Sequence, residues 1–211
     1  MTLANKLTFF RIILAPVFFI VFFLPAFFPS WFTNGTEWTV LALWLIFIVS
    51  EITDLLDGMA ARKRNEVSDF GKLLDPFADT LTQITCFLCF VIDGIFPAVL
   101  FLLVVYREFF ILFIRNLMLK NGITMGARIG GKIKTVSYII AGGSALLTVS
   151  IQRLSVLESL LPYFKIGALV IFSISVIISL VSFFDYLSVY GKAVKKACAD
   201  SFDENKQKKQ I

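Results

Sequence analysis

Long hydrophobic runs separated by short polar segments dominate the chain. Six apolar stretches lie at about 5–27, 37–57, 70–92, 96–119, 132–152 and 162–189. An α-helix rises about 1.5 Å per residue and the hydrocarbon core of a bilayer is about 30 Å thick, so each stretch is long enough to cross a membrane. Turn-forming residues, such as Pro29 and the Asn34-Gly35 pair, separate the stretches. The pattern predicts an all-α polytopic membrane protein with six transmembrane helices.

Composition agrees with this prediction. The chain is 58% hydrophobic and only 17% charged, with a mean hydropathy of +0.84, which excludes the class of soluble globular proteins. The first apolar stretch lacks a short hydrophobic region followed by a small-residue cleavage site, so we expect a retained span and not a signal peptide. We expect residues 1–190 to form one membrane domain and residues 191–211 a charged cytoplasmic tail.

The basic residues indicate the orientation in the membrane. Nearly all of the Lys and Arg residues fall at one side of the predicted bundle, and only Arg153 and Lys165 lie near the other side. The positive-inside rule therefore places both termini and the two basic loops in the cytoplasm. The net charge of +5 fits this topology, and no basic face interleaved with aromatic residues suggests nucleic-acid binding.

The absence of certain residues narrows the chemistry. The chain contains no histidine, which excludes zinc-histidine sites, haem-histidine ligation and Ser-His or Cys-His dyads. Cys86 and Cys89 form a CxxC pattern inside an apolar run. In that setting we expect both thiols to behave as small buried hydrophobic groups.

Four aspartates recur at helical spacing on two successive predicted helices. One face near the end of the second helix carries Asp54, Asp57, Gly58 and Ala61. One face at the start of the third carries Gly71, Asp75 and Asp79. Residues three or four apart share a helix face, and both helix ends lie at the cytoplasmic leaflet, so the four carboxylates are expected to converge.

Such a cluster needs a cationic partner. A charged aspartate in hydrocarbon costs about 2.5 to 3.5 kcal/mol on insertion scales, and clustered like charges repel one another. Carboxylate oxygens suit hard divalent cations such as Mg²⁺ or Mn²⁺, and Mg²⁺ often shares its site with substrate phosphates. The alternative is a set of loop charges paired with the nearby basic residues Arg62, Lys63, Arg64 and Lys72. The interleaved small residues favour the cation site, because they let a ligand approach the backbone.

These residues resemble the signature of a known family. Asp54, Asp57, Gly58, Ala61, Arg62, Gly71, Asp75 and Asp79 read as D-x2-D-G-x2-A-R-x8-G-x3-D-x3-D, which is similar to the motif of the CDP-alcohol phosphotransferases. The resemblance implies a six-helix core, a site facing the cytoplasm, a homodimer and an integral membrane protein of the bacterial inner membrane. Family members transfer a substituted phosphate from a CDP-linked donor to an alcohol and release CMP.

The resemblance also implies roles for the motif residues. Asp54, Asp57, Asp75 and Asp79 would bind one or two Mg²⁺ or Mn²⁺ ions that bridge the donor diphosphate. Asp79 would alternatively act as the general base that accepts the proton of the attacking hydroxyl. The cytidine and diphosphate would lie against Gly58, Ala61, Arg62 and Gly71. The segment around Asn5, Thr8 and Arg11 resembles a further motif beside this site, although it equally suits an ordinary helix start at the membrane interface.

Basic residues in the second half of the chain bear on the acceptor. Arg107 and Arg115 lie eight residues apart in the fourth predicted helix, and Lys132 and Lys134 begin the fifth. Guanidinium and ammonium groups are the usual phosphate ligands. A structural ion pair between Arg107 and Glu108 is the alternative, because an intramembrane arginine is costly unless it is paired or hydrated.

Within the family, R-E-x6-R followed by G-K-x-K-T resembles the branch whose acceptor is glycerol 3-phosphate. That branch transfers the phosphatidyl group of CDP-diacylglycerol and gives phosphatidylglycerophosphate and CMP. A site at the leaflet boundary suits such a donor, because its acyl chains stay among the membrane lipids. Inositol phosphate, serine or diacylglycerol as acceptor remains an alternative, as does a cation transporter that uses the aspartates as an ion relay. We see neither internal repeats nor broken helices typical of transporters.

Overall fold

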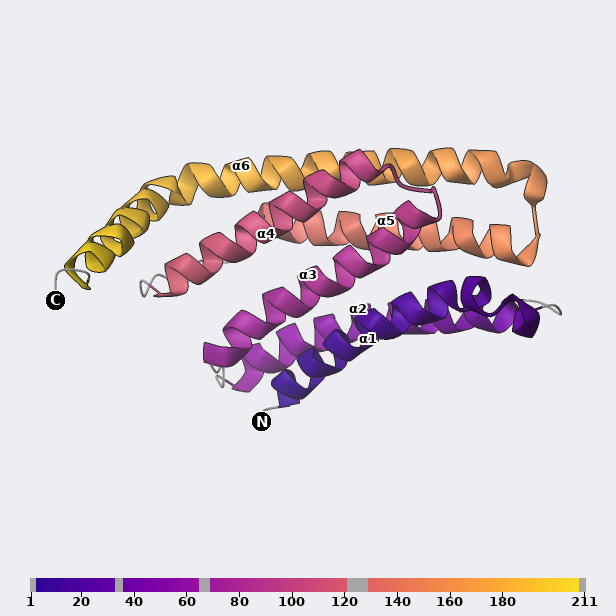
Figure 1. Ribbon diagram of the computed structural model, residues 1–211, viewed down its shortest axis with the longest axis horizontal. Coiled ribbons are helices and arrows are strands. Elements are labelled where there is room, and N and C mark those ends of the chain that lie inside the picture. Colours follow the sequence, from indigo (N-terminus) through magenta and orange to yellow (C-terminus); the bar gives the residue numbers. More distant parts are fainter. Residues whose placement is uncertain (1–2, 33–35, 65–68, 121–128, 209–211) are drawn as a thin grey trace.

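The chain folds into an antiparallel bundle of long helices (Figure 1). The computed structural model describes residues 3–32, 36–64, 69–120 and 129–208. Within these ranges the side chains of residues 3–5, 55–64, 69–70, 72–73 and 192–208 lie outside the description. The α-helices are α1 (Leu3–Phe27), α2 (Glu37–Arg64), α3 (Asp69–Ile92), α4 (Ala98–Lys120), α5 (Ile129–Leu154) and α6 (Leu161–Lys208). Two short 3-10 helices are also present, η1 (Pro29–Phe32) and η2 (Glu158–Leu160). The described residues contain no strand, which confirms the all-α prediction.

The helix boundaries differ from the apolar stretches at two places. Helix α2 continues through Arg64, although its apolar stretch ends near residue 57, and α6 continues to Lys208. The helix therefore includes Arg62, Lys63 and Arg64, which were expected to lie in a loop. The cause is that Ala, Arg and Lys have high helix propensity, so a helix extends beyond the segment that the membrane requires.

Four stretches among the described residues are long and apolar enough to cross a membrane. They are Lys6–Phe27, Leu74–Ile92, Ile129–Leu154 and Glu158–Gly191. Helices α2 and α4 are also long, at 28 and 23 residues, but charged residues such as Glu51, Arg107 and Glu108 interrupt their apolar runs. The structure thus supports an integral membrane protein with at least these four apolar helices.

Local sequence explains how several helices begin and end. The carbonyl oxygen of Thr36 accepts hydrogen bonds from the backbone N–H groups of Thr39 and Val40 at the start of α2, and Glu37 lies in the first turn, where a negative charge complements the helix dipole. After α3, Gly94 has a φ of +75°, and the N–H of Ile95 donates to the carbonyl of Phe90. This left-handed glycine ends α3 and turns the chain towards α4.

The bundle core is rich in phenylalanine. The rings of Phe96 and Phe172 stack with centroids 3.9 Å apart, and Phe87 meets each of them edge-on. Cys86 and Cys89 are buried in the same cluster as free thiols, as expected. Much of the outer surface is also apolar, including Phe10, Leu41, Phe113 and Val181, as lipid-facing helices require.

The helices meet in a definite order. Helix α1 packs on α2 and α3, α5 packs on α6, and α4 packs on α6 and α3. In Figure 1 the start of α1, the end of α2, the start of α3 and the end of α6 all lie towards the left of the view. The charged motif residues at these helix ends are therefore gathered at one end of the bundle.

Candidate active site

Three of the four motif aspartates lie around one buried arginine. The Arg11 Nη1 atom on α1 is 2.5 Å from Asp54 Oδ1 on α2 and also donates to Asp79 Oδ1 on α3. The Arg11 Nη2 atom is 3.9 Å from Asp75 Oδ1. The Arg11 side chain is 3% exposed, whereas the three carboxylates are each about 40% exposed. Asp54, Asp75 and Asp79 therefore lie together around Arg11, as expected. The side chain of Asp57, the fourth aspartate, lies outside the described residues.

The start of α1 contributes a second contact to this site. The hydroxyl of Thr8, which is 1% exposed, donates a hydrogen bond to Asp75 Oδ1. Thr8 and Arg11 are three residues apart and share one face of α1. The side chain of Asn5 lies outside the described residues, so only the Thr8 and Arg11 positions are seen beside the aspartates.

The remaining motif residues are only partly described. Gly71 is buried near the start of α3. The backbone of α2 continues through Asp57, Gly58, Ala61 and Arg62, but their side chains lie outside the described residues. Among the side chains that are described, no group of three His, Cys, Asp or Glu residues is arranged to hold a metal ion as it stands.

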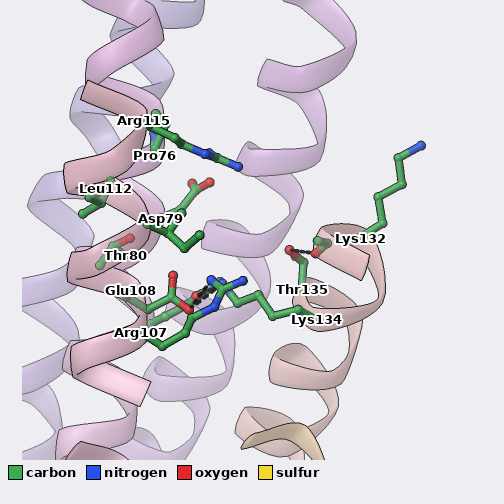
Figure 2. Close-up of a pocket in the computed structure, with 13 residues that line it drawn as sticks. Pro76, Asp79, Thr80, Arg107, Glu108, Leu112, Arg115, Lys132, Lys134 and Thr135 are labelled. Atoms are coloured by element: carbon green, nitrogen blue, oxygen red, sulfur yellow. Dashed lines mark hydrogen bonds and ion pairs between the residues drawn. The ribbon is translucent and has the colours of Figure 1, made fainter. Parts of the chain in front are cut away.

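A cavity of about 210 Å³ lies beside the aspartates. The four predicted basic residues all line it: Arg107, Arg115, Lys132 and Lys134. Figure 2 shows these side chains coming from α4 on one side and α5 on the other, with Lys132 extending away from the rest. Asp79 forms part of the same wall, so the cavity adjoins the aspartate site directly.

The structure confirms the ion pair between Arg107 and Glu108, and it also places Arg107 at the wall of the cavity. Arg107 Nη1 donates to Glu108 Oε1 over 2.9 Å, and Lys134 Nζ donates to the same oxygen over 2.9 Å. All three side chains are buried. Arg107 is therefore a member of an internal ion pair and also lines the cavity. Neither Arg115 nor Lys132 has an acidic partner within 4 Å among the described side chains.

Lys134 is held from three directions. Besides Glu108, its ammonium donates to Gln83 Oε1 over 3.1 Å and lies 4.5 Å from the ring centroid of Tyr138. The Tyr138 hydroxyl in turn donates to Ser179 Oγ on α6 over 2.7 Å. These contacts fix one cation at the wall of the cavity.

A smaller cavity of about 20 Å³ lies on the other side of Asp79. Arg11, Ser50, Glu51, Asp54 and Thr82 line it, and it shares Asp79, Gln83 and Thr135 with the larger cavity. Asp79 thus separates the basic cavity from the aspartate site. A group bound in either cavity would lie against this carboxylate.

Sequence reasoning missed Gln83 and Glu51 as lining residues. Gln83 follows Asp75 and Asp79 at the same spacing of four, so the helical period could have included it. Glu51 precedes Asp54 by three positions and could have been found in the same way. The meeting of Lys134 with Glu108 has no such local signal, because the two residues belong to different helices.

Comparison with known proteins agrees with the motif. Residues 1–181 match the family described as CDP-alcohol phosphatidyltransferase. The chain is 33% identical over 204 residues, 94% of its length, to the CDP-diacylglycerol--glycerol-3-phosphate 3-phosphatidyltransferase of Treponema pallidum, of which the match covers 93%. It is 35% identical over 147 residues to the protein of that name from Bacillus subtilis, covering 69% of this chain and 76% of that protein. A Haemophilus influenzae protein of the same name is 29% identical over 190 residues, which cover 87% of this chain and 90% of that protein.

These matches establish the class of protein. The chain belongs to the CDP-alcohol phosphatidyltransferase family, so it is a transferase of phospholipid synthesis from a family that generally depends on divalent metal ions. The relatives named above are, by their printed names, enzymes that use CDP-diacylglycerol and glycerol 3-phosphate.

Proposed function

We propose that the protein transfers the phosphatidyl group of CDP-diacylglycerol to the hydroxyl of glycerol 3-phosphate, giving phosphatidylglycerophosphate and CMP. The observation that carries this proposal is the shared wall at Asp79, which joins a basic cavity to an aspartate site. The names of the bacterial relatives support the same donor and acceptor.

The basic cavity has the charge that a phosphomonoester requires. Four basic side chains and two acidic side chains, Asp79 and Glu108, line the cavity. Its walls therefore carry a net charge of about +2 when all of these groups are ionised. A phosphomonoester carries about −1.5 to −2 charges at neutral pH. Arg115 and Lys132, which have no acidic partner among the described residues, are the groups expected to bind the acceptor phosphate first.

Asp79 is proposed as the general base. With the acceptor phosphate held by the basic residues, the acceptor hydroxyl faces the wall that Asp79 forms. A carboxylate there accepts the hydroxyl proton as the oxygen attacks the donor phosphorus, and the bond from that phosphorus to CMP breaks. The acceptor oxygen thereby replaces CMP on the phosphatidyl group.

The aspartate site fits a divalent cation. Three carboxylates from two helices already surround one cationic group, the Arg11 guanidinium, and carboxylate oxygens are the ligands that Mg²⁺ and Mn²⁺ prefer. Asp54, Asp57, Asp75 and Asp79 would hold one or two such ions. A bound ion there would neutralise the donor diphosphate and make its phosphorus more electrophilic.

The donor is proposed to lie along the ends of α2 and α3. Gly58, Ala61 and Gly71 offer close approach to the backbone, and Arg62 offers a charge to the diphosphate. Asn5 and Thr8 at the start of α1 would border the same nucleotide site. At this end of the bundle the acyl chains of the donor can remain in the bilayer.

The wider organisation is also proposed. All six helices cross the bacterial inner membrane, with α2 and α4 stabilised in it by their internal ion pairs. Both termini and the active site face the cytoplasm, residues 1–190 form the catalytic domain, and residues 191–211 form a cytoplasmic tail. The enzyme acts as a homodimer, as its resemblance to the family implies.

CMP release tests the proposed reaction. Purified protein in detergent, given CDP-diacylglycerol and Mg²⁺ or Mn²⁺, is expected to release CMP with glycerol 3-phosphate and not with serine or inositol phosphate. Asp57→Asn is expected to abolish release, because it removes a proposed cation ligand. Asp93→Asn, in the turn that follows the opposite end of α3, is the matched control and is expected to retain activity. Release with another acceptor alone would refute the proposed acceptor.

Substitution at Asp79 tests the base separately from the acceptor. Asp79→Asn keeps the shape of the side chain but cannot accept the hydroxyl proton, so kcat is expected to fall by at least about 100-fold, the usual contribution of general-base catalysis. Protein folding is checked by its melting temperature. Full turnover in the folded variant would exclude Asp79 as the base.

A further inference from the structure

Arg11 has an unusual position for a residue outside the aspartate motif. Its guanidinium contacts carboxylates from two different helices, and its side chain is almost completely buried. It comes from α1, which contributes none of these acids but packs against both α2 and α3. One side chain therefore links three helices through their charges.

The physical need for this cation is clear from its surroundings. Carboxylates that are gathered at one point repel one another, and an opposite charge removes that repulsion. Arginine suits the role, because its planar guanidinium presents several N–H donors in fixed directions and stays protonated. Arg11 uses both terminal nitrogens for this purpose, with Nη1 shared between Asp54 and Asp79.

The same oxygens are the proposed ligands of the divalent ion. A cation bound among Asp54, Asp75 and Asp79 would repel the guanidinium and would need the oxygens that Arg11 now contacts. The two cations therefore compete for one set of carboxylates. Whatever free energy the Arg11 contacts contribute is subtracted from the binding of the ion, as linkage requires.

We infer that Arg11 is an internal counter-cation that holds the aspartates together and gives way when a divalent ion binds. The inference rests on the proposed metal site. Arg11 is a positioning residue in this scheme: it keeps α1, α2 and α3 associated before the ion binds, and it lowers the apparent affinity of the site for the ion.

Metal affinity and thermal stability test the inference without an activity assay. Mn²⁺ binding to the purified protein in detergent is measured by the loss of the electron paramagnetic resonance signal of free Mn²⁺, and melting temperatures are measured with EDTA and with Mn²⁺. Arg11→Met is expected to bind Mn²⁺ about tenfold more tightly, which corresponds to the removal of about 1.4 kcal/mol of competition. Its melting temperature is expected to fall in EDTA and to recover with Mn²⁺.

Arg153→Met is the matched control. Arg153 is also a partly buried arginine that joins helices, since Nη2 donates to the Phe22 carbonyl over 2.6 Å and Nη1 to Thr39 Oγ1 over 3.4 Å. It lies at the other end of the bundle and has no carboxylate within 4 Å among the described residues. Its substitution is expected to lower the melting temperature equally with EDTA and Mn²⁺ and to leave Mn²⁺ affinity unchanged.

The possible results separate the inference from the proposed function. If wild-type protein binds Mn²⁺ but Arg11→Met has the wild-type affinity and the wild-type melting temperature in EDTA, the inference is wrong and the metal site stands. If wild-type protein does not bind Mn²⁺, the inference about Arg11 and the proposed metal site are both wrong. Should Arg11→Met fail to fold under either condition, Arg11→Lys decides. Lysine keeps the positive charge but lacks the two terminal nitrogens of the guanidinium. Arg11→Lys is therefore expected to bind Mn²⁺ more tightly than wild type, by less than Arg11→Met would. An Mn²⁺ affinity equal to that of wild type overturns the inference.

Discussion

Glu108 is the only carboxylate among the described residues that contacts the basic residues of the larger cavity within ion-pair distance. It accepts from both Arg107 and Lys134 at 2.9 Å and is almost fully buried. Removing one partner of a buried ion pair leaves the other charge without compensation, which is far more costly than losing an exposed pair. Glu108 therefore sets both the stability of the bundle and the positions of the two cations.

Glu108→Gln is expected to lower the free energy of unfolding by about 3 kcal/mol and to raise the KM for glycerol 3-phosphate more than the KM for CDP-diacylglycerol. The neutral amide cannot hold Arg107 and Lys134 as the carboxylate does. Thermal melts and steady-state kinetics with each substrate varied provide the measurements. Glu158→Gln, at an exposed residue of η2, is the control, and equal behaviour of the two variants would contradict the role of Glu108.

At the residue scale, local spacing determined what could be predicted. The aspartate positions follow from periods of three and four within single helices, and the sequence neighbours Arg107 and Glu108 indicated their ion pair. The contacts of Lys134 with Glu108 and of Arg11 with the aspartates depend on how separate helices pack. Short-range patterns do not contain that information, so the site was predicted as a set of residues but not as a network.

At the scale of elements, Gly142 of α5 lies close to the ring of Phe47 of α2. A Cβ atom at this position would lie 3.0 Å from Cε2 and 3.2 Å from Cζ of Phe47, which is closer than ordinary contact distance. The neighbouring Gly143 has no atom within 4 Å of its Cβ position. The absence of a side chain at Gly142 therefore serves a contact between α5 and α2 within the chain.

Gly142→Val is expected to destabilise the bundle by about 1 to 3 kcal/mol, the usual cost of overpacking, because the ring of Phe47 would have to shift from its packed position. Gly143→Val provides the control, since its side chain enters open space and is expected to change the melting temperature far less. Melting temperatures of the two variants in the same detergent provide the measurement. Equal decreases in melting temperature for the two variants would mean that the close contact at Gly142 does not determine the packing of α5 on α2.

The described residues form six α-helices near the six predicted stretches, and four of these contain a segment apolar enough to cross a membrane. Hydrophobic runs indicate the part of a helix that lies in lipid, and so they locate α1, α3 and α5 closely. They do not indicate where the helix ends, because the backbone hydrogen bonds of α2 and α6 continue through polar residues that favour helix. The charges that line the site, such as Glu51 and Asp54 in α2 and Arg107 and Glu108 in α4, interrupt the apolar runs of these two helices.

At the scale of the whole molecule, the orientation in the membrane can be tested with single cysteines. In a variant without native cysteines, Lys120→Cys at the end of α4 and Glu158→Cys on η2 lie at opposite ends of the bundle. In intact bacteria an impermeant maleimide is expected to label residue 158 and not residue 120, because the positive-inside rule places the end of α4 in the cytoplasm.

Membrane disruption provides the control, since both residues are exposed and are then expected to react. Labelling of residue 120 in intact cells, with residue 158 protected, would reverse the proposed orientation. Labelling of both residues in intact cells would show that the two helix ends lie on the same side, and it would contradict the six-span arrangement.

The packing order of the helices has a consequence for the passage of molecules through the enzyme. Helices α4 and α5 both line the larger cavity, and each packs mainly on α6. In the described part of the chain their backbones come close at few places, and the ion pair between Glu108 and Lys134 joins them at the cavity wall. The cavity thus lies behind a seam between two helices. In the proposed reaction the acceptor is a small anion and the product carries two acyl chains, so we expect the product to leave sideways between α4 and α5 into the bilayer.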